Sequence, residues 1–127
     1  MSNPYKGRTG LDRVRRALGY SIEGLKAAYT GESAFRQEVW LLAIATPLAF
    51  WLGRDWVQIA LLLGSLVQVL IVELLNSGIE AAIDRVSFEL HELSKRAKDI
   101  ASAAVLLSLL LTGGVWAAAL WQKLAAG

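Results

Sequence analysis

The chain has 127 residues, of which 55% are hydrophobic, and its mean hydropathy of +0.45 is too high for an ordinary small soluble domain. Thirteen basic and eleven acidic residues give a net charge of +2, which is no indication of nucleic-acid binding. The absence of cysteine excludes disulfides, thiolate chemistry and cysteine zinc sites, and a single histidine cannot form a histidine metal cage. We expect no cleaved signal peptide, because an apolar segment with a cleavage site is missing near Met1. The length suits one membrane domain over residues 1–127.

Residues 11–29 form the first expected helix, because apolar side chains recur there every three or four residues and so share one face. These residues are Leu11, Val14, Leu18, Ile22, Leu25 and Tyr29. A basic helix with one apolar face is typical of a helix that lies flat at a membrane surface, although a helix packed on a soluble core or on a partner has the same pattern. Two glycines in this helix, Gly19 and Gly24, could allow another backbone or a ligand to approach closely.

Three apolar stretches follow, and we expect each of them to cross a membrane: residues 34–52, 56–86 and 100–121. The second stretch is long enough to cross the hydrocarbon layer and to emerge into water with its last turns. Tryptophans flank the turn between the first two stretches and recur in the third, as in the aromatic belts at membrane surfaces. The sequence therefore predicts an all-α membrane protein with three transmembrane helices and an N-terminal amphipathic surface helix.

The first of these stretches is the weakest, because its uncharged part is short for a bilayer that takes about 20 helical residues. It can span a membrane if Arg36 and Glu38 near its start reach the interface or pair with each other. Pro47 lies inside it and is expected to kink the helix, so that neighbouring helices must satisfy the freed backbone carbonyl.

Basic residues are distributed unevenly between the polar segments, and their distribution predicts the topology. They concentrate before residue 27 and in the connection at residues 85–98, whereas the first turn and the C-terminus have one each. Basic residues are enriched on the cytoplasmic side of membrane proteins. We therefore expect a cytoplasmic N-terminus, a cytoplasmic connection at residues 85–98 and a periplasmic C-terminus.

The second apolar stretch carries a set of polar side chains, here called the acidic stripe. At about 100° per residue these side chains fall within an arc of roughly 100°. They are Glu73, Asn76, Ser77, Glu80 and Asp84. A charged side chain in the middle of a membrane helix costs about 2.5–3.5 kcal/mol, so the acidic stripe indicates a functional site. A second polar stripe leads into the third apolar stretch and comprises His91, Lys95, Lys98, Asp99 and Ser102.

Together the two stripes contain the groups that phosphoryl transfer requires. Carboxylates one helical turn apart can hold Mg²⁺ together with phosphate oxygens, and nearby lysine and arginine can neutralise a polyphosphate. A carboxylate that faces a lipid alcohol can act as a general base. The motifs of P-loop NTPases and protein kinases are absent, which excludes soluble kinase architectures. From the residues alone, an enzyme and an ion or proton pathway are equally open.

Four segments resemble motifs of the small prokaryotic diacylglycerol kinases. The segment from Glu73 to Asp84 is similar to the family signature Glu-x-x-Asn-(Ser/Thr)-x-Ile-Glu-x-x-x-Asp, with Gly78 at a position where alanine is common. The other three segments begin at Gly19, Glu32 and His91. The resemblance extends over about residues 13–121 and therefore covers nearly the whole chain.

The resemblance implies a homotrimer of three-span protomers in the bacterial inner membrane, with active sites between protomers. It implies transfer of the γ-phosphate of MgATP to the free hydroxyl of diacylglycerol, which gives phosphatidic acid. Glu73 is then expected to be the general base, Asn76 to orient the base or a phosphate, and Glu32 and Glu80 to bind Mg²⁺. The expected nucleotide contacts are Arg13, Tyr20, Ser21, Glu32, Asn76, Glu80, Asp84, Glu89, His91, Lys98 and Asp99. The expected lipid contacts are Arg36, Gln37, Glu38, Glu73 and Ser102.

Two alternative functions remain at this stage. An undecaprenol or other polyprenol kinase would share most of these motifs, although residues 35–38 are more similar to the Gram-negative branch of the family than to the Gram-positive branch that phosphorylates undecaprenol. A non-enzymatic membrane subunit or ion pathway is disfavoured, because a pore needs charges along the whole span and the acidic stripe stops in the cytoplasmic half. Individual residues also have plainer interpretations: Asp84 as a solvated helix end, Lys98 as an orientation charge and His91 as an exposed loop residue.

Overall fold

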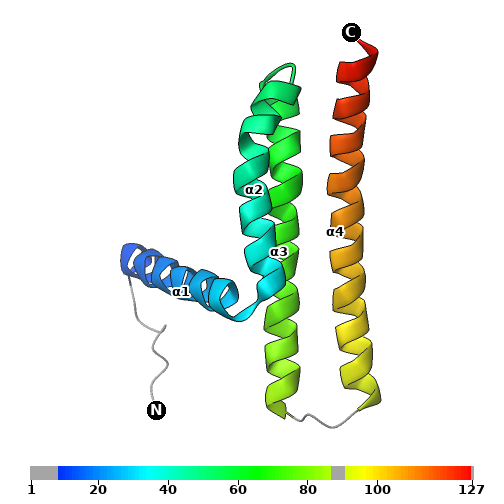
Figure 1. Ribbon diagram of the computed structural model, residues 1–127. Coiled ribbons are helices and arrows are strands. Elements are labelled where there is room, and N and C mark those ends of the chain that lie inside the picture. The colour runs from blue at the N-terminus through cyan, green and yellow to red at the C-terminus, as the bar shows by residue number, and fades with distance from the viewer. Residues whose placement is uncertain (1–8, 87–90, 127) are drawn as a thin grey trace.

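The computed structural model describes residues 9–86 and 91–126, and within them all regular structure is α-helical, which confirms the expected all-α class. The four helices are α1 Gly10–Gly31, α2 Ser33–Leu52, α3 Trp56–Val86 and α4 Glu92–Ala125. Helices α2, α3 and α4 run side by side, and α1 lies crosswise to them beside α3 (Figure 1). Helix α3 packs mainly on α4 and next on α2.

The corner between α1 and α2 is sharp because a single residue, Glu32, separates the two helices in an extended conformation with φ −120° and ψ 110°. The Arg36 guanidinium stabilises this corner, since its Nη1 donates to the carbonyl oxygens of Tyr29 at 2.8 Å and Thr30 at 3.1 Å. These two acceptors lie at the end of α1, where backbone carbonyls lack helical partners. Arg36 therefore contacts the end of α1, whereas the sequence suggested pairing with Glu38.

The turn between α2 and α3 requires a residue without a side chain. A Cβ atom at Gly53 would collide with the side chain of Ile59 and would lie 3.0 Å from the carbonyl oxygen of Ala49. The turn is completed by Asp55, whose Oδ1 accepts from the backbone N–H of Gln58 at 2.8 Å in the first turn of α3. Helix α2 before this turn continues unbroken through Pro47.

Helices α3 and α4 are joined by hydrogen bonds along their apolar parts, here called the polar seam. The hydroxyls of Ser65 and Thr112 lie 2.8 Å apart. Gln68 Nε2 donates to the backbone oxygen of Ser108 at 2.8 Å. In a membrane such interhelical hydrogen bonds help to hold helices together, because hydrocarbon offers no other partner. The polar seam thus fixes how far α4 is shifted along α3.

The end of the bundle at the α2–α3 turn holds a small apolar core of Ala49, Leu52, Leu62 and Ala119. Polar contacts close it, among them Gln58 Nε2 to Gln122 Oε1 at 2.9 Å and Lys123 Nζ to the Trp51 carbonyl oxygen at 3.1 Å. This end is anchored independently of the acidic stripe, which lies on α3 toward the other end (Figure 1).

Within the described residues two helices, α3 and α4, are long and apolar enough to cross a membrane. In the most apolar 18-residue segments of α3 and α4, only 22% and 11% of the residues are buried, unlike in the core helix of a soluble protein. Helix α2 does not reach the same apolarity, because polar residues occupy its first turns: Arg36, Gln37 and Glu38. The described residues thus contain two candidate membrane spans, and the expected third span at residues 34–52 is not among them.

Helix α4 begins earlier than the apolar stretch that it contains. His91 caps it, since Nδ1 accepts from the backbone N–H of Leu93 at 3.1 Å, and the helix starts at Glu92. Polar residues from Glu92 to Asp99 are therefore helical and continuous with the apolar stretch. This continuity brings the second polar stripe alongside the last turns of α3.

Candidate active site

Half-buried carboxylates from three parts of the chain lie near Glu73 of α3. Glu38 of α2, Glu32 at the α1–α2 corner and Glu80 of α3 are all close enough for their negative charges to repel that of Glu73. Glu73 and Glu80, which are expected to act together, are therefore close enough for their charges to interact. A cation bound among these carboxylates would offset their mutual repulsion.

Asn76 lies between these two carboxylates on α3 and has an unusual environment. Its Nδ2 donates to Glu80 Oε1 at 3.4 Å, a long contact. Its Oδ1 is buried and has no hydrogen-bond partner within the described part of the chain. An unsatisfied buried acceptor costs about 1–3 kcal/mol, so this oxygen is an available acceptor for a donor supplied from outside the protomer.

The last turns of α3 meet α4 through an ion pair between Asp84 and Lys98, with Oδ1 and Nζ 2.8 Å apart. Both side chains are 41% exposed, so the pair is accessible from solvent. One turn along α4, Lys95 Nζ lies 2.7 Å from Asp99 Oδ2 in a still more exposed pair. The sequence-predicted nucleotide residues Asp84, Lys98 and Asp99 are thus grouped at one end of the helix pair.

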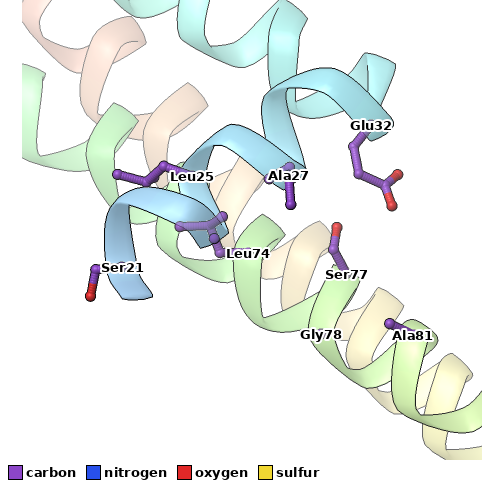
Figure 2. A pocket seen from close by; sticks show the side chains of 10 residues that line it. Ser21, Leu25, Ala27, Glu32, Leu74, Ser77, Gly78 and Ala81 are labelled. Carbon is purple, nitrogen blue, oxygen red and sulfur yellow. The ribbon is translucent and has the colours of Figure 1, made fainter. Parts of the chain in front are cut away.

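A hollow of about 690 Å³ lies between α1 and α3, here called the α1–α3 hollow. Figure 2 shows the Glu32 and Ser77 side chains pointing toward each other, with Leu25, Leu74 and Ser21 further along. The remaining lining is small: Gly24, Ala27, Ala28, Gly78 and Ala81. The hollow is therefore mostly apolar, with one charged residue, Glu32, in its lining.

A second hollow, of about 490 Å³, lies between α3 and α4 and is lined by apolar side chains and by Asn76. At about 100° per residue, its α3 residues lie on one flank of the acidic stripe and those of the α1–α3 hollow on the other. A third hollow, of about 470 Å³, lies against α2 and is lined in part by Arg36 and Gln37. The carboxylates thus lie between two open spaces, one beside α1 and one beside α4.

Other sequence-predicted residues lie outside these clusters. Arg13 and Tyr20 are exposed on α1, Ser102 is exposed on α4, and none of them lines the three hollows described above. Ser21 lines the α1–α3 hollow, where its hydroxyl donates to the Ala17 carbonyl oxygen at 2.9 Å. Glu89 falls outside the described residues.

The site also includes residues that the sequence-level assignment missed, namely Gly24, Leu74 and Gly78 in the α1–α3 hollow. Glycine at position 24 carried a hint, because it can admit a close neighbour. No sequence signal points to Leu74, because leucine is common in any apolar helix. Leu74 lines the hollow because α1 crosses α3 beside it.

The donor set suits Mg²⁺ only in combination with phosphate. Within residues 9–86 and 91–126 no group of three or more His, Cys, Asp or Glu side chains could hold a metal ion. Magnesium in phosphoryl-transfer sites is commonly held by one or two carboxylates plus substrate phosphates and water. Glu32 and Glu80 both lie near Glu73 and are carboxylates of the kind that could hold a metal arriving with a nucleotide.

The fold and the site define an integral membrane protein with a polyacidic site on a membrane-length helix. A sequence model described as prokaryotic diacylglycerol kinase matches residues 19–120. The chain is 48% identical to a diacylglycerol kinase of Escherichia coli strain K12 over 90% of this chain and 93% of the relative. It is 50% identical to that of Pseudomonas aeruginosa over 91% and 94%, and 44% identical to that of Helicobacter pylori strain 26695 over 84% of each chain. The chain therefore belongs to the prokaryotic diacylglycerol kinase family.

Proposed function

We propose that this diacylglycerol kinase takes the γ-phosphate from MgATP and transfers it to the free hydroxyl of diacylglycerol, giving phosphatidic acid and ADP. The main support is sequence similarity: the chain is 48% and 50% identical to the diacylglycerol kinases of two bacteria, over 90% and 91% of its length. The clustered carboxylates beside an apolar hollow agree with it, because they bring phosphate chemistry next to a lipid-compatible surface.

Glu73 is the general base in this proposal. It accepts the proton of the acceptor hydroxyl as the oxygen attacks the γ-phosphorus and the bond to the ADP oxygen breaks. Asn76 orients either Glu73 or a phosphate oxygen through its donor Nδ2, and its Oδ1, which has no partner within the described residues, can accept from a hydroxyl or another donor of a bound group.

Glu32 and Glu80 bind Mg²⁺ in this proposal. The metal, when bound with ATP, would neutralise charge on the phosphates. Lys98 adds a cation that can exchange its contact with Asp84 for one with a phosphate oxygen. The further nucleotide contacts are proposed on the family motifs, namely Arg13, Tyr20, Ser21, Glu89, His91 and Asp99.

The acceptor lipid approaches Glu73 from the apolar side of the site. We place its glyceride part in the α1–α3 hollow, whose lining is mostly apolar. Glu38, which lies near Glu73, would contact the polar part of the lipid. Arg36 and Gln37 in the first turns of α2 and Ser102 within α4 would do the same. Arg36 would do so from the α1–α2 corner, where its guanidinium already contacts two carbonyl oxygens.

The assembly in this proposal is a homotrimer in the bacterial inner membrane, with α2 as a third span, α1 on the cytoplasmic surface and the C-terminus in the periplasm. Support comes from the large apolar surface that one protomer leaves exposed along α3 and α4. Among the described residues, the acidic stripe forms an ion pair with Lys98 through Asp84, and further cations from a neighbouring protomer would help to neutralise a polyphosphate. A neighbouring protomer would supply the missing wall of each site.

The test is a kinase assay on protein purified in mixed micelles or vesicles, with diacylglycerol and a polyprenol as competing acceptors. We expect MgATP-dependent formation of phosphatidic acid, and little phosphorylation of the polyprenol. Preferential phosphorylation of the polyprenol would replace the substrate assignment while leaving the kinase assignment intact. ATP-independent ion flux without either product would refute both.

A further inference from the structure

Two glycines line the α1–α3 hollow from opposite walls, Gly24 on α1 and Gly78 on α3. A Cβ atom added at either position would meet no described atom within 4 Å. Packing within the protomer therefore does not require a glycine at these two positions, in contrast to Gly53, where a Cβ would collide with Ile59. Glycine inside a helix is also less favourable than alanine, so the absence of a side chain here calls for another explanation.

The chemistry of the lining favours one kind of occupant. Glu32 is the one charged residue among the described residues that line the hollow, and its carboxylate would repel the polyphosphate of a nucleotide that entered without the Mg²⁺ that Glu32 is proposed to bind. The opposite end is formed by Leu25 and Leu74, side chains that suit hydrocarbon (Figure 2). An uncharged glyceride can place its free hydroxyl toward the carboxylates and its chains along the leucines.

We propose that Gly24 and Gly78 determine the acceptor specificity of this enzyme, because the missing side chains widen the α1–α3 hollow enough to admit a glyceride with two acyl chains. This inference rests on the proposed function and deepens it. A side chain at position 78 projects into space that the second chain occupies, whereas a slimmer lipid alcohol still fits. Gly78 is thus a residue that sets the width of the acceptor site, and it takes no part in the chemical step.

The experiment compares Gly78→Ala, Gly78→Leu and Gly24→Ala with wild type, using a long-chain diacylglycerol and a single-chain monoacylglycerol as acceptors. One methylene group in an apolar pocket changes discrimination by about 10- to 200-fold. We expect the ratio of kcat/KM for the two-chain acceptor to that for the single-chain acceptor to fall about tenfold in Gly78→Ala, and further in Gly78→Leu. The KM for the two-chain acceptor should rise while the KM for MgATP stays at the wild-type value.

A matched control is available on α3. Gly64 also meets nothing within 4 Å of an added Cβ, but it does not line the hollow. Gly64→Ala gains the same helical propensity as Gly78→Ala, so it should leave the acceptor ratio unchanged. Helical content measured by circular dichroism would confirm that every variant folds.

Three results would overturn the inference. The first is an unchanged acceptor ratio in Gly78→Leu, and the second is an equal change in Gly64→Ala. The third is an equal loss with both acceptors together with loss of cross-linked oligomer, which would mean that a second copy of the chain occupies the hollow. Failure of the proposed function is distinguishable from all three, because wild-type protein would then phosphorylate neither acceptor.

Discussion

The structural and catalytic roles of Lys98 can be tested separately. Among the described residues, its ammonium group forms an ion pair with Asp84. Both partners are 41% exposed, and exposed pairs contribute about 0.2–1 kcal/mol to stability. Lys98→Met should therefore lower the free energy of unfolding by less than about 1 kcal/mol. If Lys98 stabilises charge on the transferred phosphate, the same change should lower kcat about 10²- to 10³-fold, which is the effect of removing one preorganised donor.

The assay pairs steady-state kinetics at saturating acceptor with chemical unfolding in the same detergent. Lys26→Met is the control, because Lys26 forms an exposed ion pair with Glu23 on α1 at 3.9 Å and lies outside both polar stripes. We expect the control to keep kcat within about threefold of wild type, as for other exposed pairs. A catalytic role of Lys98 would be ruled out by equal kinetic losses in both variants. It would also be ruled out if Lys98→Met clearly lost stability but kept the wild-type kcat.

Three further variants test other parts of the structure. Asn76→Leu should lower kcat while raising resistance to unfolding, because it removes a buried acceptor that has no partner within the described residues; lower stability would contradict the idea that this oxygen accepts from a ligand. Gln68→Leu should reduce stability by about 0.6–1.7 kcal/mol in lipid through loss of its hydrogen bond to Ser108, measured by unfolding against wild type. Gly53→Ala should destabilise the α2–α3 turn because the new Cβ collides with Ile59, and unchanged stability would show that the turn relaxes.

The helices themselves could be anticipated from the sequence because their causes are local. Apolar residues at three- and four-residue spacing predict the apolar face of α1, and an uncharged run predicts the start of α3. The acidic stripe could be placed on one face by the same arithmetic, and Glu73 and Glu80 indeed lie in one electrostatic neighbourhood. Each of these features depends on the order of residues within one helix.

Features that depend on packing between helices could not be anticipated in this way. The guanidinium of Arg36 contacts the end of α1 because Glu32 turns the chain sharply, and no periodicity encodes that corner. The α1–α3 hollow, and with it the role of Gly78, follows from where α1 crosses α3. Helix α4 begins at Glu92, and the exposed His91 just before it is the N-cap residue, a role that the apolar periodicity did not predict.

Glu73→Gln tests the claim that a carboxylate near the apolar hollow removes the acceptor proton. Glutamine preserves the size of the side chain but cannot act as a base at neutral pH. We predict loss of at least about 10²-fold in kcat with unchanged helical content, whereas Glu23→Gln, which alters an exposed carboxylate of α1, keeps wild-type turnover. Wild-type turnover by Glu73→Gln would contradict the claim.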